Sequence, residues 1–211
     1  MKCFSRTSVT AQFFCIAFLF HRQPAYAVDF GGGLYATEAF GKYKLEGVPS
    51  VGIKPHTTKL GLNLALDSKL GTAQRFAYRL GATLGWWSLN DGRDYGFRGN
   101  GYGIGVDQTL GYIVSQHRAF QVYAGPSINL SIGRMQDALD TVILAAGGAG
   151  PSVGINFANG WHNTSYSLAL TYILAFSILD WNSGVFPYRG TNHAVSMNAT
   201  VFFASKPKGA P

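Results

Sequence analysis

Covalent chemistry in this sequence would have to come from a histidine near a serine or threonine, because a histidine base can activate such a hydroxyl for acyl transfer. Three combinations are present: His162-Asn163-Thr164, His56 with Asp67-Ser68, and His193-Ala194-Val195-Ser196. The five histidines are dispersed along the chain, and none shares a metal-binding spacing with cysteines or carboxylates. We therefore expect no metal site and no cofactor. Each histidine–hydroxyl combination could be catalytic only if the fold brings its two side chains together.

Charged side chains are the second kind of reactive residue, and they are scarce. Only 13% of the chain is Asp, Glu, Lys or Arg, against roughly 25% in an ordinary soluble domain. We predict that Lys59, Arg79, Asp107 and Glu38 point into a narrow interior, where a charge must be paired. Arg79 and Asp107 are expected at similar heights on adjacent strands. We therefore predict an interior ion pair between them, joined by Glu38, and favour a satisfied polar core over a proton or ion path.

Strands must position these residues, because the dominant pattern is an alternation with period two. From Phe76 to Trp86 the even positions are mostly large and apolar, whereas the odd positions from Ala77 to Gly85 are small or polar. The same alternation marks eight segments, near residues 34–43, 59–64, 76–87, 102–114, 120–132, 153–157, 166–178 and 195–203.

Short and long connections alternate between these segments. Turn residues mark short links at 67–71, 115–118 and 158–160, and longer connections fall at about 45–56, 89–100, 134–144 and 180–192. Closure is required in a membrane, because an open sheet edge in hydrocarbon would leave backbone groups unpaired. The predicted fold is all-β, an eight-stranded antiparallel up-and-down transmembrane β-barrel over residues 28–203. A short amphipathic helix is expected from Met135 to Leu144.

A soluble eight-stranded ligand-carrier barrel is the main alternative, because it alternates as well. It would turn its apolar face inward and need a charged exterior, whereas the second face here is mostly Gly, Ala, Ser, Thr and Asn. Small side chains suit a crowded interior, and the large apolar ones suit lipid. Residues 165–179 could be mistaken for a membrane helix, but they fall short of the about 20 residues that a helical span needs.

The N-terminal residues 1–27 have the pattern of a secretory signal, with a basic start, an apolar stretch from Val9 to Phe20 and the triplet Ala25-Tyr26-Ala27. We predict cleavage between Ala27 and Val28, with an uncleaved anchor helix as the alternative. The segment holds both cysteines and three of the 17 basic residues but no acidic residue, so the formal net charge would fall from +7 to +4. The mature chain would have no disulfide, and without a basic run it is not expected to bind nucleic acid.

The export signal, the eight alternating segments, the connections and a final segment ending in Phe203 resemble the small outer-membrane barrels of the OmpA transmembrane-domain and opacity-protein type. The resemblance covers residues 28–203 and is architectural. It implies a location in the outer membrane of a Gram-negative bacterium, and a barrel-insertion machinery that reads the last strand at Phe203. Members of that family usually stop at this aromatic residue, whereas here residues 204–211 follow. We expect them to be a disordered periplasmic tail.

Enzymes that modify lipid A share this architecture, and their patterns test the histidine combinations. The deacylase type has His-x-Ser and a nearby glutamate, but His162-Asn163-Thr164 lacks the serine and no glutamate follows Glu46. The palmitoyl-transferring type has a histidine with an Asp-Ser pair near the outer rim, but the predicted topology places Asp67-Ser68 on the periplasmic side, away from His56. The third combination lies on opposite strand faces. We expect no catalytic residue and keep a lipid A-modifying enzyme as the alternative.

Function is expected in the loops, because eight strands leave an interior that side chains fill. A narrow channel is a further alternative. Basic residues near the outer rim could bind lipopolysaccharide phosphates; they are Lys42, Lys44, Lys54, Lys59, Arg93, Arg98, Arg134 and Arg189. Solvated loop charges balanced by nearby aspartates are the simpler alternative. We predict a monomeric structural or surface-interaction protein, serving envelope integrity or adhesion, with outer-membrane lipid, lipopolysaccharide and a host or surface ligand as partners.

Overall fold

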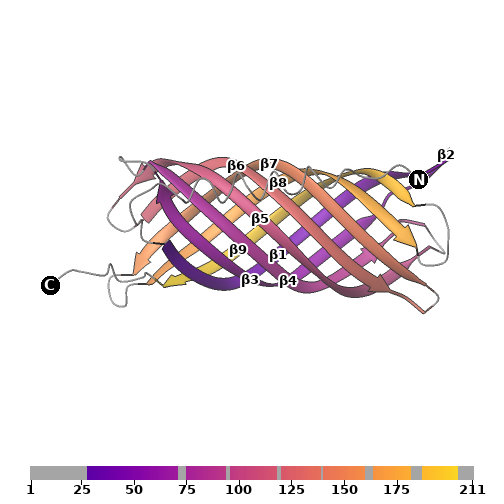
Figure 1. The fold of residues 1–211 in the computed structure, drawn as a ribbon, viewed down its shortest axis with the longest axis horizontal. Helices are drawn as coiled ribbons and strands as arrows, with labels where there is room; N and C mark the ends of the chain where they lie inside the picture. Colours follow the sequence, from indigo (N-terminus) through magenta and orange to yellow (C-terminus); the bar gives the residue numbers. More distant parts are fainter. Residues whose placement is uncertain are drawn as a thin grey trace, which may run out of the picture.

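The alternating sequence forms a closed antiparallel sheet in the computed structural model, which describes residues 28–70, 75–93, 96–117, 120–138, 140–159, 164–181 and 187–203. The described strands are β1 (Val28–Leu45), β2 (Val48–Ile53), β3 (His56–Leu70), β4 (Phe76–Asn90), β5 (Arg98–Gln116), β6 (Phe120–Gln136), β7 (Thr141–Asn159), β8 (Thr164–Trp181) and β9 (Tyr188–Phe203). Because β1 pairs with both β3 and β9, all strands except β2 form a ring of eight, as predicted. Figure 1 shows this ring as a cylinder of tilted strands.

The two ends of the cylinder differ in their connections. The start of β1 and the end of β9 lie at one end, the terminal end, with the short links that follow β3, β5 and β7. The strand β2 and the connections that follow β4, β6 and β8 lie at the opposite end, the loop end (Figure 1). The predicted secretory signal, Ala27 at its cleavage site and residues 204–211 lie outside the described residues, so these assignments stay predictions.

The first long connection contains a strand rather than a loop. The chain turns at Glu46 and Gly47, where Gly47 has a φ of +84° that favours glycine. It then returns as β2, which pairs with β1 from Tyr43 opposite Ile53 to Leu45 opposite Val48. This hairpin extends the barrel wall beyond the ring at the loop end (Figure 1).

The predicted helix from Met135 to Leu144 is wrong. The strand β6 continues to Gln136 and β7 begins at Thr141. A tight turn joins them, in which Asp137 N donates to Asp140 O at 3.1 Å and Asp140 N donates to Asp137 Oδ1 at 2.8 Å. The third connection is therefore short. The apolar residues of the predicted helix lie in β6 and β7, where Val142 and Leu144 are buried and Ile143 is exposed, as expected for a strand.

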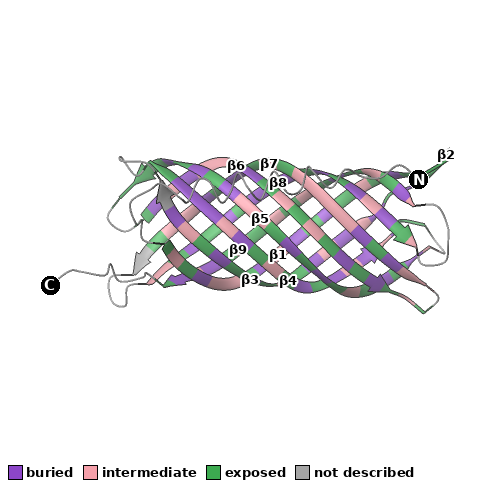
Figure 2. Ribbon diagram, viewed as in Figure 1, coloured by how far each residue is buried: buried purple, intermediate pink, exposed green. Residues whose placement is uncertain are grey.

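The outside of the ring is apolar over most of its length. Outward leucines are more than half exposed, including Leu62 at 61%, Leu84 at 57% and Leu130 at 56%. Figure 2 shows exposed and buried residues alternating along the strands. A continuous apolar belt of this kind is unfavourable in water and favourable in hydrocarbon, so the transmembrane β-barrel predicted from the sequence is confirmed. Among the described residues, no helix is both long and apolar enough to cross a bilayer.

The wall is taller than a bilayer requires. The ring strands have 15 to 19 residues, whereas about 10 tilted residues cross the hydrocarbon. Outward residues turn polar toward the loop end, as at Lys42 and Lys44 on β1 and Arg134 on β6. The extra length therefore places the loop end of the lumen beyond the apolar belt.

Candidate functional site: a closed lumen and a cationic rim

The terminal end of the lumen is filled by Arg79 on β4, which is only 7% exposed. Its guanidinium donates to Tyr123 OH at 2.8 Å, Ser167 Oγ at 2.9 Å, Asn156 Oδ1 at 3.1 Å and Asp67 Oδ2 at 3.2 Å. The guanidinium also lies over the rings of Tyr123 and Phe202, at 5.1 Å and 4.8 Å from their centroids, where the cation is attracted by the ring faces. This one side chain ties together β3, β6, β7, β8 and β9.

The predicted ion pair between Arg79 and Asp107 is not formed. Asp67 lies directly opposite Arg79 on β3, whereas the residue opposite Arg79 on β5 is Thr109. The carboxylate on β3 is therefore the one that reaches the guanidinium. Asp107 lies opposite Gly81, whose missing side chain leaves room for the carboxylate, and it lines the central cavity.

The prediction that Glu38 points into the interior and joins the ion pair is wrong. On β1 the buried residues fall at odd positions, such as Tyr35 and Ala39, so Glu38 points outward. Its Oε2 accepts hydrogen bonds from His56 Nε2 at 2.6 Å and from Thr58 Oγ1 at 3.1 Å. The three consecutive glycines before Leu34 leave no alternation at the start of this strand from which its faces could be read.

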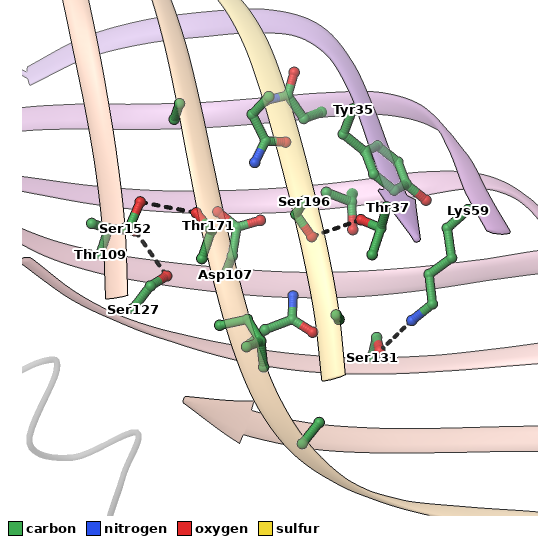
Figure 3. Close-up of a pocket in the computed structure, with 18 of the residues that line it drawn as sticks. Tyr35, Thr37, Lys59, Asp107, Thr109, Ser127, Ser131, Ser152, Thr171 and Ser196 are labelled. Atoms are coloured by element: carbon green, nitrogen blue, oxygen red, sulfur yellow. Dashed lines mark hydrogen bonds between the residues drawn. The ribbon is translucent and has the colours of Figure 1, made fainter. Parts of the chain in front are cut away.

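The middle of the lumen is a polar cavity of about 60 Å³, which has room for a few water molecules at most. Hydroxyl and amide pairs line its wall, three of them between directly opposite residues of adjacent strands. The pairs are Thr37–Ser196 at 2.7 Å, Asn63–Thr200 at 2.9 Å, Thr109–Ser127 at 2.9 Å and Ser152–Thr171 at 2.9 Å. Figure 3 shows several of these side chains pointing toward one another from different strands. The pairing satisfies most of the polar groups within the wall, as a buried polar core requires.

Lys59 lies in this lumen and not at the rim. Its Nζ donates to Ser131 Oγ at 3.0 Å (Figure 3) and lies 3.9 Å from the centroid of the Trp87 ring. Lys59 is 8% exposed. The prediction that it points inward is confirmed, and the prediction that it contacts lipopolysaccharide is wrong.

An apolar plug closes the loop end of the lumen. Its buried members are Tyr43, Ile53, Trp87, Leu89, Phe97, Met135, Val142, Leu144, Leu179 and Tyr188. Trp87 is 1% exposed and crosses the lumen into the space left by Gly103 and Gly133, where a side chain would overlap its ring. Polar contacts around Arg79 therefore obstruct the terminal end of the lumen, and apolar packing around Trp87 obstructs the loop end.

The connection from β4 to β5 covers the plug. Asp91 is completely buried there, and its carboxylate accepts hydrogen bonds from Arg93 N at 3.1 Å and Arg93 Nε at 2.8 Å. These hydrogen bonds raise the pKa of the Arg93 guanidinium. Arg93, which was predicted to contact lipopolysaccharide, instead stabilises this loop through its contacts with Asp91.

The other predicted rim residues are exposed around the loop end. Arg189 is paired with Glu46 at 3.1 Å. The remaining five form no ion pair with a carboxylate of the described residues; they are Lys42, Lys44, Lys54, Arg98 and Arg134. These five residues, the cationic rim, are the positive groups that remain available to an anionic partner.

The histidine–hydroxyl combinations are not assembled in the described structure. His56 and Ser68 lie near opposite ends of β3. Ser196 is bonded to Thr37 inside the lumen, whereas His193 is exposed on the outside. His162 lies outside the described residues. Where the chain is described, no three His, Cys, Asp or Glu side chains are grouped to hold a metal ion.

An outward polar group around Phe40 was not predicted from the sequence. It contains the Glu38–His56 pair and a second pair, Tyr172 OH with His193 Nδ1 at 2.5 Å. A spacing of two residues in the sequence could have indicated this group. Glu38 and Phe40 share one face of β1, and His56 and Thr58 share one face of β3.

Comparisons with known proteins agree with the architecture. No protein-family model matches the sequence, and no curated protein matches it. Among solved structures, the outer membrane protein OprG from Pseudomonas aeruginosa is 15% identical with a TM-score of 0.59, covering 84% of this chain and 95% of that one. The outer membrane protein AlkL, solved in lipid bilayers, is 12% identical with a TM-score of 0.54, covering 90% and 96%. The chain therefore has the fold of the small eight-stranded outer-membrane β-barrel proteins.

Proposed function

We propose that this protein is a closed, monomeric outer-membrane barrel with a structural or surface-interaction role, which it performs through its loop end and through contact with lipopolysaccharide. The proposal includes export by the signal in residues 1–27 and insertion through a machinery that reads the last strand at Phe203. It excludes transport through the lumen and catalysis. The loop end would face the cell exterior and the terminal end the periplasm.

The observation that carries the proposal is the closure of the lumen. Arg79 and its partners occupy the terminal end, and the plug around Trp87 occupies the loop end. A solute path would have to break the buried ion pair or displace a packed aromatic ring, and both changes are unfavourable. A barrel filled in this way acts through its outer surface and its loops.

The cationic rim supports a contact with lipopolysaccharide. Its five side chains lie at the loop end, beside the point where the outer surface changes from apolar to polar. Lipopolysaccharide phosphates would lie at this height, and lysine and arginine bind phosphate through charge-assisted hydrogen bonds. The same proposal includes adhesion, in which the loops would bind a host or surface ligand.

Binding of lipopolysaccharide by the purified barrel in neutral detergent tests this proposal. Replacing Arg98 and Arg134 by glutamine should weaken binding by roughly tenfold at low ionic strength, with a smaller effect at high salt. Arg75→Gln is the matched control, because Arg75 is an exposed arginine at the terminal end. Equal losses in both variants would contradict a role for the rim. An altered lipid A mass spectrum in cells that make the protein would contradict the non-enzymatic role.

A further inference from the structure

A group of polar side chains interrupts the lipid-facing surface across β8, β9, β1 and β3. We name it the Phe40 patch, and its residues are Glu38, Phe40, His56, Thr58, Tyr172 and His193. The strand register brings them together, because Phe40 is opposite His193 on β9 and opposite His56 on β3. Phe40 is 59% exposed, and its ring stacks on that of His56 with 4.5 Å between centroids and 6° between planes.

On β1 and β3 the patch lies at the boundary of the apolar belt, whereas on β8 the exposed Leu174 and Phe176 continue the belt past Tyr172 toward the loop end. On β3, His56 and Thr58 precede four outward leucines, at positions 60, 62, 64 and 66, that run toward the terminal end. On β1, Phe40 is followed on the same face by Lys42 and Lys44 toward the loop end. An ionisable side chain that faces hydrocarbon is costly and marks a functional site. At this boundary it would meet lipid headgroups instead.

The hydrogen bonds within the patch fix its side chains but leave binding groups open. Both contacts to Glu38 use Oε2, so Oε1 has no hydrogen-bond partner among the described residues. His56 uses only Nε2 and His193 only Nδ1, so one nitrogen of each ring is also open. Each imidazole is therefore held in place by a neighbour while its second nitrogen can bind a ligand.

We infer that the Phe40 patch binds the phosphorylated sugar headgroup of one outer-leaflet glycolipid. The stacked rings of Phe40 and His56 offer a flat apolar face to a sugar ring. Glu38 Oε1 can accept a hydrogen bond from a sugar hydroxyl, and Lys42 with His193 can bind a phosphate. The positive charges beside the patch complement this anion, and the leucines below it suit the acyl chains. The inference rests on the proposed outer-membrane role and adds a defined site to it.

Titration of the reconstituted barrel with purified lipid A, in nanodiscs of phosphatidylcholine, tests the inference. The double variant Phe40→Leu/His193→Leu should lose about tenfold or more in affinity for lipid A, by removing the aromatic platform and a phosphate donor. Glu38→Gln should lose less, because the amide oxygen still accepts a hydrogen bond. Inorganic phosphate should compete only weakly, since it lacks the sugar and the acyl chains.

Arg75→Gln is the matched control, because it removes an exposed charge at the terminal end and should leave lipid A binding unchanged. Arg98→Gln/Arg134→Gln removes rim charge from β5 and β6 and leaves the patch intact, so it tests the proposed function separately. Lipid A binding that survives the patch variant but not the rim variant would overturn the inference and leave the proposed function standing. No binding by the unaltered barrel would overturn both. Each variant must keep the heat-modifiable migration of a folded barrel, and dimers bridged through the patch instead of lipid A would also contradict the inference.

Discussion

Arg79 is the residue on which the polar half of the interior depends. It is buried, and its guanidinium pairs with Asp67 and donates to three further side chains. Replacing Arg79 by methionine keeps much of the volume but leaves Asp67 unpaired inside the lumen. We expect the free energy of unfolding in detergent to fall by about 3–5 kcal/mol, the usual cost of breaking a buried pair from one side.

Asp107→Asn is the control for this variant, because Asp107 lines the same lumen without pairing with Arg79. Its effect on urea unfolding should be clearly smaller than that of Arg79→Met. Comparable losses in the two variants would indicate that Asp107 is the true partner of Arg79.

Lys59 gives a second test at the residue scale. It lies in the lumen beside Trp87, whereas Lys42, Lys44 and Lys54 are exposed. An amine-reactive reagent applied to the folded barrel should therefore modify those three lysines and spare Lys59, and unfolding in urea should expose Lys59 to the reagent. Peptide mass spectrometry measures both. Prompt modification of Lys59 in the folded barrel would show that the lumen is open to small molecules.

At the scale of elements, the packing of β5 and β6 against Trp87 depends on glycine. A side chain at Gly133 would overlap the Trp87 ring, whereas one at Gly32, on β1, would meet its nearest atom, Leu64 Cδ2, at 3.8 Å. Gly133→Ala should therefore lower the free energy of unfolding by about 1–3 kcal/mol, as overpacking does. Gly32→Ala should change it little. Thermal unfolding followed by heat-modifiable migration compares the pair, and similar behaviour of the two variants would contradict this packing.

The sequence predicts the positions of the strands better than it predicts which side chains contact one another inside the barrel. Regular alternation from Phe76 to Trp86 correctly assigns the faces of β4, whereas the glycines at the start of β1 obscure its alternation, and Glu38 is placed on the wrong side. Register is the other limit. Whether Arg79 meets Asp67 or Asp107 depends on a pairing shift of two residues, which ring closure decides and local pattern does not. Met135 to Leu144 fits helix and strand spacing alike, and the barrel wall selects the strand.

At the scale of the whole molecule, one closed barrel combines an apolar exterior, a filled lumen and a cationic rim. The exterior requires a membrane, and the filled lumen supports the proposed role of the outer surface. The Phe40 patch with the neighbouring Lys42, and the rim residues Arg98 and Arg134 on β5 and β6, then offer two contacts to anionic lipid, one on each side of the ring.

Conductance of the purified barrel in a planar lipid bilayer tests the closed lumen most directly. We predict no discrete conductance steps from the unaltered protein, and steps from a Trp87→Ala/Arg79→Ala variant, in which the main obstructions at both ends have been truncated. Steps from the unaltered protein, of the same size as those from the variant, would contradict the account and identify the barrel as a channel.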